Sequence, residues 1–326
     1  MTKALIFGTG AVGCVYGYIL HQAGVEVVAA CRSNYDAVKE AGITIRSPLY
    51  GNVHYAPIAV QNLAEAITHG PFDYILVCSK AFPGDSKRIQ IAVSPATAIV
   101  LAQNGIGIEE EYLQLYPDNT IISGVVWLPT VQVAPGVIAM GPKERLDIGT
   151  YPASASQTHK ARVNDLSRLW AAGGGDAPVY DDIQVQRWSK LTVNFAFNPV
   201  SALTRCDEAN FLLSSDIADD LLVKVMRQVS QIAAAEGYKH ITEDLIQESM
   251  KHNRLRKVIG GKDPSMLMDV KAGRPIEVEA ILGNTVRIAQ KHGLDVPYVD
   301  MLYGLATGLN FSLVKDERWV TPLLAT

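Results

Sequence analysis

Residues 3–13 read KALIFGTGAVG, and this stretch decides the fold of the first half of the chain. Its first five residues form an apolar, strand-like run. The glycines Gly8, Gly10 and Gly13 follow with the spacing G-x-G-x-x-G, and 25–30 reads as a second strand after a helix-like segment. This order is typical of a dinucleotide-binding unit, in which the first glycine permits a tight turn, the second lets a pyrophosphate approach and the third lets the helix pack closely. The N–H groups at the start of the helix can then bind the phosphates. The alternative is a tight turn without a ligand.

The end of the second strand indicates which dinucleotide binds. NAD sites normally carry an acidic residue there for the ribose 2′-hydroxyl, whereas NADP sites carry a cation for the 2′-phosphate. Here the position is taken by Arg32 and Ser33, and the nearest acid is Asp36. Because an arginine can bind a phosphate through two parallel hydrogen bonds, the sequence predicts NADPH; a solvated surface arginine is the alternative. The residues expected to hold the cofactor at this end of the chain are Gly8, Thr9, Gly10, Ala11, Val12, Gly13 and Arg32.

The bulk composition describes an ordinary globular protein of about two domains. The chain has 326 residues, of which 48% are hydrophobic and 19% are charged, and its formal net charge is -4. This charge gives no reason to expect nucleic acid or an acidic membrane as a partner. No apolar run reaches the ~18 residues of a membrane span, and the first apolar run is too short for a signal peptide.

The cysteines show no metal-binding pattern. Cys14, Cys31, Cys78 and Cys206 have neither C-x-x-C nor Cys/His spacing, so we expect buried thiols and no metal site. Reduced thiols are typical of the cytoplasm, which is the expected location.

Alternating strand and helix signals in the first half predict a Rossmann-type parallel sheet with crossover helices. Beyond 25–30, strand-like runs occur at 43–45, 74–78, 98–102, 120–126 and 178–180, helices are expected at 62–68 and 161–172, and 136–149 reads as antiparallel strands or a hairpin. Later, long helical periods dominate, at roughly 184–204, 215–236, 242–252, 276–292 and 297–310. We predict an α/β fold with an NADP-binding Rossmann domain at 1–181 and an all-helical substrate and catalytic domain at 182–326.

Two polar residues follow strands at the edge of the sheet where such folds bind ligands. Lys80 comes two residues after the run 74–78, and Asn104 comes two residues after the run 98–102. Lys80 can offer a cation to cofactor or substrate, and Asn104 can offer both a donor and an acceptor. The alternatives are a solvent-exposed lysine and an asparagine that only forms a turn.

The first helix of the second domain carries an unusual polar row. Lys190, Asn194 and Asn198 recur at every fourth residue, so on a helix they share one face with about 6 Å between neighbours. The surrounding residues are apolar, and polar groups in such a place are costly unless a partner satisfies them. A polar substrate is one such partner, and a lysine in a partly dry pocket can act as a general acid or base. A helix–helix hydrogen-bond network is the other.

Farther along, the residues alone leave the interpretation open. Pro275 suits the first turn of a helix, and Glu277 would then lie near the positive end of the helix dipole. Ser265 is compatible with simple capping.

Together these pieces resemble the ketopantoate reductase family (2-dehydropantoate 2-reductases) and are similar to its fungal members. The matching pieces span nearly the whole chain, and they are 8–13, 79–81, 103–105, Lys190 with Asn194 and Asn198, 265–269, and 273–277. Each piece alone is unspecific, but their order and spacing are specific.

The resemblance implies a Rossmann domain, a helical domain and an active site in the cleft between them. It implies that NADPH reduces the 2-oxo group of 2-dehydropantoate to pantoate, in the pathway to pantothenate and coenzyme A. Lys190 would be the general acid, and Glu277 would engage the hydroxyl end of the substrate and support the lysine. Lys80 would contact the cofactor. The residues implied to position the substrate are Asn104, Asn194, Asn198 and Ser265, and Asn104 is also expected to contact the cofactor.

Three departures from the family pattern concern the substrate. Phe82, Pro264 and Ile276 stand where polar residues are common in the family. One alternative is therefore an NADPH-dependent reductase of another 2-oxo acid, ketone or imine in secondary metabolism, and a second is an NADPH-binding sensor without catalysis. The expected partner is a small-molecule 2-oxo acid. Family members occur as monomers and dimers, so a homodimer stays open.

Overall fold

The structure is a computed structural model and describes residues 1–314. The chain divides into two compact units, Met1–Gln186 and a second that begins at Arg187. The division falls inside the first turn of helix α7 (Gln184–Thr204), a few residues after the predicted domain boundary.

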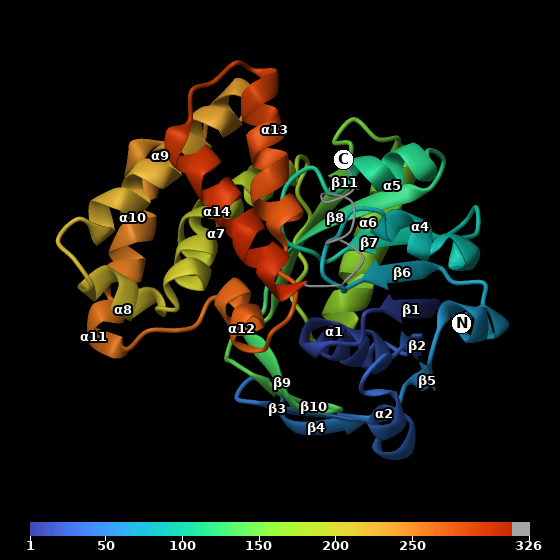
Figure 1. Cartoon of the computed structure of the whole chain (residues 1–326). Helices are drawn as coiled ribbons and strands as arrows, with labels where there is room; N and C mark the ends of the chain where they lie inside the picture. The colour runs from blue at the N-terminus through green and yellow to red at the C-terminus, as the bar shows by residue number, and fades with distance from the viewer. Residues whose placement is uncertain (315–326) are drawn as a thin grey trace, which may run out of the picture. The chain divides into compact units, whose positions relative to one another are not determined.

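A seven-stranded sheet forms the centre of the first unit (Figure 1). In their order across the sheet, the strands are β11 (Arg145–Tyr151), β8 (Thr120–Trp127), β7 (Ala98–Leu101), β6 (Tyr74–Val77), β1 (Lys3–Phe7), β2 (Glu26–Ala30) and β5 (Ile58–Val60). All neighbours are parallel except β11, which runs antiparallel to β8. The predicted Rossmann-type sheet is therefore confirmed.

The order of the strands indicates which edge of the large sheet is suited to bind a ligand. The chain passes from β1 to β2 on one side and later returns to β6 on the other side of β1, with Ile6 paired to both Ala29 and Leu76. The loops after β1 and β6 therefore leave the same edge of the sheet in opposite directions. Open α/β sheets bind their ligands at such a switch point.

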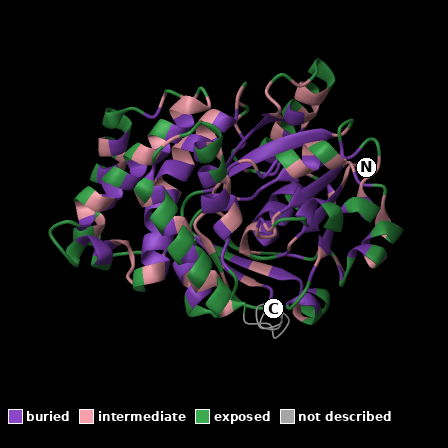
Figure 2. Ribbon diagram, turned by 45° about the horizontal axis from the view of Figure 1, so that its top comes forward, coloured by how far each residue is buried: buried purple, intermediate pink, exposed green. Residues whose placement is uncertain are grey.

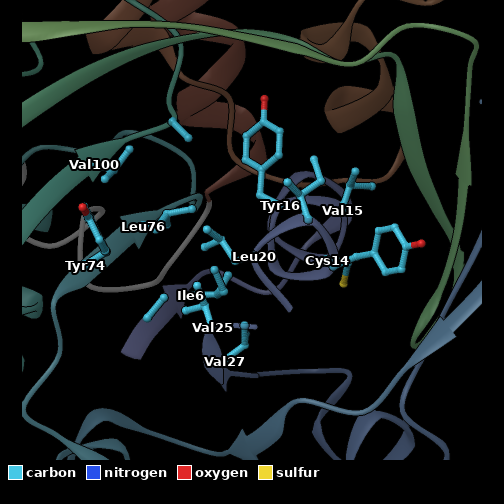
Figure 3. Close-up of a cluster of buried hydrophobic side chains, with 14 of the residues drawn as sticks. Ile6, Cys14, Val15, Tyr16, Leu20, Val25, Val27, Tyr74, Leu76 and Val100 are labelled. Atoms are coloured by element: carbon cyan, nitrogen blue, oxygen red, sulfur yellow. The ribbon is translucent and has the colours of Figure 1, made fainter. Parts of the chain in front are cut away.

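Apolar side chains fix helix α1 (Ala11–Gln22) against the sheet. Figure 3 shows Ile6, Leu76 and Val100 from three neighbouring strands gathered with Val15 and Leu20 of α1. All five are at most 1% exposed. Because β6 and β7 are buried throughout, their sequences are continuously apolar, as strands covered on both faces require.

A second, four-stranded sheet decides between two options that the sequence left open. Its order is β4 (Gly51–Tyr55), β3 (Ile43–Ser47), β10 (Val137–Met140) and β9 (Thr130–Ala134), with β10 parallel to β3 and the other pairs antiparallel. The segment 136–149 therefore contains antiparallel strands, as one of the two options predicted, and not one hairpin, because β10 pairs with β9 while β11 pairs with β8 in the large sheet. The predicted strand 178–180 is reduced to one isolated bridge, Ile148 to Val179. Residue alternation detects strands but does not identify their partners.

The remaining helices of the first unit are short except the last. They are α2 (Tyr35–Ala41), α3 (Leu63–Ala66), α4 (Asp85–Arg88), α5 (Glu110–Leu115) and α6 (Gln157–Ala172). In Figure 2 the central strands of the seven-stranded sheet are almost wholly buried, whereas helices show both buried and exposed residues.

The described residues of the second unit contain helices and no strand, which confirms the predicted helical region. After α7 come α8 (Glu208–Leu213), α9 (Ala218–Ala235), α10 (Glu243–Arg254), α11 (Arg256–Ile259), α12 (Ser265–Lys271), a π-helical turn (Glu279–Gly283), α13 (Asn284–Lys291) and α14 (Pro297–Leu313). Helix α9 packs against α8, α10, α13 and α14, because Leu222, Met226 and Val229 recur at helical spacing and are fully buried. None of the described helices is both long and apolar enough to span a membrane.

Candidate active site

The three glycines of the loop after β1 have different physical roles. Gly8 has a φ of +99°, and a Cβ atom there would lie 2.3 Å from the backbone nitrogen of Ser79. A Cβ atom on Gly13 would lie 2.3 Å from the carbonyl oxygen of Gly8. Gly10, in contrast, has nothing within 4 Å of its added Cβ and stands at the N-terminus of α1. Packing therefore requires Gly8 and Gly13, while Gly10 leaves open backbone where a pyrophosphate can approach.

The residues between the glycines, Thr9, Ala11 and Val12, differ in what they can offer a ligand. Thr9 is 6% exposed, and its Oγ1 donates a hydrogen bond of 2.9 Å to the carbonyl oxygen of Ala30 at the end of β2. The Thr9 side chain therefore stabilises the loop and is not available to a ligand. Ala11 and Val12 begin α1 and are half-buried; the N–H groups of a first helical turn have no partner within the helix.

A cation follows β2, where the predicted 2′-phosphate site lies. Arg32 and Ser33 are exposed, and Asn34 behind them is buried. Within residues 1–314, Arg32 makes no ion pair or side-chain hydrogen bond. Its guanidinium is therefore available to bind a phosphate in the plane of its five N–H donors.

The loops after β6 and β7 meet beside the glycine loop. The backbone of Ser79 lies against Gly8, and the Nε2 atom of Gln103 donates a hydrogen bond of 2.9 Å to the carbonyl oxygen of Ser79. Lys80 and Asn104, the two predicted ligand-binding residues, are half-buried neighbours of these residues. The sequence predicted Asn104 at this edge, but it did not predict that Gln103 connects the two loops. The available signal was a polar residue directly after a buried strand.

These features fit a dinucleotide. The open backbone at Gly10 leaves space for a pyrophosphate. Arg32 follows β2 and could bind the 2′-phosphate of the dinucleotide. The Oγ atom of Ser79 is buried and has no hydrogen-bond partner among the described residues, so a polar group is missing from this edge of the sheet.

The nearby thiols are not nucleophiles. Cys14 on α1 and Cys31 after β2 are buried free thiols. Burial, followed by the proximity of Cys31, raises the pKa of Cys14 to about 12, and burial raises the pKa of Cys31. Such thiols stay protonated at neutral pH. Cys78 and Cys206 are only half-buried, which corrects the expectation of four buried cysteines.

In the second unit, α7 carries the predicted polar row. Lys190 and Asn194 are half-buried and Asn198 is 5% exposed, while Trp188 and Phe195 on the same helix are at most 1% exposed. The amides and the lysine thus lie along a helix that is otherwise packed into the core of its unit. Both the substrate interpretation and the network interpretation require partners for these groups.

The structure gives Asn198 such partners. Its Oδ1 atom accepts hydrogen bonds from Oγ of Ser265 at 3.2 Å and from the backbone N–H of Met266 at 3.1 Å. Because the residue before α12 is Pro264, which provides no side-chain cap, Asn198 caps this helix from α7. Two of the predicted substrate-binding residues, Asn198 and Ser265, are therefore in contact. The oxygen of Asn198 is used in the fold, and its amide donors have no partner within 1–314.

Glu277 lies in a different local structure from the one expected. The predicted helix at 276–292 begins as the π-helical turn Glu279–Gly283, so Pro275 precedes the helix instead of occupying its first turn. Glu277 is 7% exposed. The N–H of Ile276 donates to Oδ1 of Asn310 on α14 at 2.9 Å, which anchors the segment directly before Glu277.

Sequence reasoning did not detect the network that supports this π-helical turn. The carboxylate of Glu279 accepts hydrogen bonds from Nη1 of Arg287 at 2.8 Å and from the hydroxyl of Tyr303 at 3.0 Å. A Cβ atom at Gly283 would lie 2.4 Å from this carboxylate. The glycine four residues after a glutamate was the only signal in the sequence. π-Helical turns occur frequently at functional sites.

The chemistry of the two units is complementary. The first has a Rossmann sheet with a dinucleotide cradle, and the second has a lysine, amides, a hydroxyl and a buried carboxylate. These are the features of a dinucleotide-dependent oxidoreductase, in which the cofactor carries the redox chemistry and the protein supplies orientation and charge.

Comparison with known proteins identifies the family. Residues 4–153 match the family model "Ketopantoate reductase PanE/ApbA", and residues 182–310 match "Ketopantoate reductase PanE/ApbA C terminal". The chain belongs to the ketopantoate reductase family, an NADPH-using family of oxidoreductases, as the sequence predicted.

Individual relatives agree with this assignment over nearly their whole length. The uncharacterized protein YDL144C of Saccharomyces cerevisiae is 30% identical, covering 94% of this chain and 92% of the relative. A 2-dehydropantoate 2-reductase of Nostoc is 28% identical, covering 92% of this chain and 93% of the relative. The crystal structure of 2-dehydropantoate 2-reductase from Methylococcus capsulatus is similar with a TM-score of 0.83 and 33% identity, over 96% and 98%.

Two more distant structures share the fold. They are a D-mandelate dehydrogenase with NADH and anilino(oxo)acetate (23% identity, TM-score 0.83, 96% and 99% covered) and a dimeric ketopantoate reductase from Staphylococcus aureus (22%, 0.77, 95% and 99%).

Proposed function

We propose that this protein reduces the 2-oxo group of 2-dehydropantoate to pantoate with NADPH, and that Lys190 is the general acid. The observation that carries the proposal is the polar row on α7, in which Asn198 contacts Ser265 while Lys190 lies two turns away on the same face. Two relatives of similar length are named 2-dehydropantoate 2-reductase, which supports the choice of substrate.

The first unit would hold the cofactor. The glycine loop and the start of α1 would bind the pyrophosphate, Arg32 and Ser33 would bind the 2′-phosphate, and Lys80 with Asn104 would contact the cofactor near the end of β6 and β7. When bound, NADPH supplies a hydride for the carbonyl carbon.

The second unit would act on the substrate. As negative charge builds on the carbonyl oxygen, the ammonium group of Lys190 stabilises it and donates a proton, which gives the 2-hydroxy acid. Glu277 would accept a hydrogen bond from the substrate hydroxyl and keep the lysine charged. Asn194, Ser265 and the amide donors of Asn198 would orient the substrate, together with Asn104.

The second candidate function is reduction of another 2-oxo acid, a ketone or an imine in secondary metabolism. It is favoured by three apolar residues, Phe82, Pro264 and Ile276, and by the shared fold of the D-mandelate dehydrogenase, whose structure holds anilino(oxo)acetate. A sensor that binds NADPH without catalysis is the weaker alternative, because Lys190 and Glu277 are both present.

The proposed setting is a role in pantothenate biosynthesis, in the cytoplasm. Four free cysteines agree with a reducing compartment. We also propose a homodimer, since the Staphylococcus aureus relative is named as dimeric. Helices α8 and α11 pack together and carry the exposed apolar residues Leu213, Val258 and Ile259, which would suit contact with a second copy.

Replacing the lysine tests the mechanism. Lys190→Ala is expected to lower kcat by about 10²–10⁴-fold, because the general acid is lost, while the Kd for NADPH stays within about twofold. Lys224→Ala, at an exposed lysine of α9 paired with Asp220, is the matched control and should leave both values unchanged. Retention of kcat in Lys190→Ala would exclude Lys190 as the general acid.

A further inference from the structure

Asn34 has an unusual position at the start of α2. It is the N-cap residue of this helix, and asparagine is among the preferred N-cap residues because its side chain can accept a hydrogen bond from the first turn. Its side chain makes no such bond here. It is nevertheless 4% exposed, so its amide must find partners elsewhere.

The partners of Asn34 lie in two distant segments. Its Nδ2 atom donates a hydrogen bond of 2.7 Å to the carbonyl oxygen of Thr9 in the glycine loop, and one of 3.3 Å to Oε1 of Gln132 on β9. Gln132 belongs to the small sheet and is half-buried. One amide group thus connects the glycine loop, the turn after β2 and the small sheet.

Thr9 is held to the same turn by its side chain. Its Oγ1 atom donates to the carbonyl oxygen of Ala30, two residues before Arg32, and its carbonyl accepts from Asn34, two residues after Arg32. The loop residue between Gly8 and Gly10 is therefore bonded on both sides of the exposed pair Arg32 and Ser33. We call this arrangement, formed by Thr9, Ala30, Asn34 and Gln132, the amide clasp.

We propose that Asn34 is a positioning residue that sets the preference for NADPH over NADH by holding the two phosphate-binding parts of the site at a fixed separation. This inference rests on the proposed cofactor site. NADPH must contact the glycine loop with its pyrophosphate and Arg32 with its 2′-phosphate at the same time. NADH has no 2′-phosphate and needs only the first contact. Loss of a hydrogen bond of the amide clasp therefore weakens NADPH binding more than NADH binding. Only NADPH makes both phosphate contacts, so only its affinity depends on their fixed separation.

A purely structural role predicts something else. Loss of a buried hydrogen bond that only stabilises the unit lowers the melting temperature, and it changes the affinities for both dinucleotides equally or not at all. The ratio of the two dissociation constants separates these cases, because a uniform loss cancels in it.

The test measures the Kd values of NADPH and NADH by fluorescence titration of the full chain, for the wild type and for Asn34→Ala. We expect the Kd of NADPH to rise about tenfold and that of NADH to rise less than about threefold, as for loss of one buried hydrogen bond that acts on one ligand. Gln132→Ala leaves Asn34 and its bond to Thr9 in place, and should shift the ratio in the same direction by about threefold. This second variant keeps the test decisive if Asn34→Ala fails to fold.

The matched control is Asn62→Ala. Asn62 is the N-cap of α3 in the same unit, and its side chain does cap that helix by accepting from the N–H of Glu65 at 3.0 Å. This variant should lower the melting temperature without changing the ratio of the Kd values. An unchanged ratio in both Asn34→Ala and Gln132→Ala overturns the inference. A wild-type chain that binds no NADPH instead refutes the proposed cofactor, so the two failures are distinguishable.

Discussion

At the scale of single residues, the three loop glycines show that one motif combines packing and binding. A side chain at Gly8 or Gly13 collides with backbone, whereas a side chain at Gly10 meets no protein atom within 4 Å. Packing therefore does not require glycine at position 10, and we expect that the absence of a side chain there serves a ligand.

This difference gives a prediction for Gly10→Ala. Its backbone, with φ -84° and ψ -165°, is open to alanine, so the melting temperature should stay within about 2 °C of the wild type. The new methyl group stands where the pyrophosphate approaches, and the Kd for NADPH should rise by about tenfold or more. Titration with NADPH and a thermal melt provide both values.

Gly13→Ala provides the contrast. Its Cβ atom would lie 2.3 Å from the oxygen of Gly8 and 2.9 Å from Cγ2 of Ile6, so this variant should lose stability by about 1–3 kcal/mol. If Gly10→Ala unfolds as readily as Gly13→Ala, or binds NADPH like the wild type, the assignment of separate roles is wrong.

The sequence predicted residues better than it predicted their contacts. The loop glycines and Arg32 follow from a motif whose spacing has a mechanical meaning. The bonds from Asn34 to Thr9 and from Gln103 to Ser79 could not be predicted, since each depends on side-chain direction across a sheet edge. The assigned roles of Lys190 and Glu277 stay predictions.

At the scale of elements, the predictions agree with the structure for long periodic segments and differ from it for short ones. Helices α7, α9 and α14 lie close to their predicted ranges, because many apolar residues repeat in each. The four-residue helix α11 was not predicted, and for the segment 136–149 the sequence left open whether its antiparallel strands pair with each other or with other strands. In short segments the pattern of apolar residues carries little information, and contacts with distant parts of the chain determine the secondary structure and the strand partners.

The contact between α9 and α10 yields a prediction about pH. Asp219 on α9 accepts two hydrogen bonds from Arg254 at the end of α10, at 2.6 and 2.7 Å, and this pairing holds the pKa of Asp219 below its ordinary value of 3.8. The ionised form is thus favoured in the folded state. The stabilisation is present above the ordinary pKa and is lost as the pH falls through the lowered one.

Asp219→Asn should therefore be less stable than the wild type at neutral pH, by no more than about 1 kcal/mol because Arg254 is partly exposed. The difference should shrink as the pH falls below 3.8. Urea unfolding at a series of pH values measures it. Asp220→Asn, which removes the exposed pair with Lys224 on the same helix, is the control and should cost less. A difference that persists unchanged at acid pH would contradict the assigned ion pair.

At the scale of the whole molecule, family membership and architecture agree with the sequence, whereas the substrate depends on a few side chains. The predicted cofactor-binding loop belongs to the first unit and the polar row with Lys190 to the second, so we expect each to be impaired separately. Gly10→Ala should weaken cofactor binding, and Lys190→Ala should lower turnover. The apolar residues Phe82, Pro264 and Ile276 leave Lys190 and Glu277 in place, and we expect them to bear on which carbonyl compound is reduced.

The most direct test of the account is the oxidation of NADPH by the purified protein with 2-dehydropantoate, followed by absorbance beside a panel of other 2-oxo acids, ketones and imines. The account predicts saturable turnover of 2-dehydropantoate, with a kcat/KM well above that of every other compound. Tight binding of NADPH without turnover of 2-dehydropantoate, or faster turnover of another member of the panel, would contradict it.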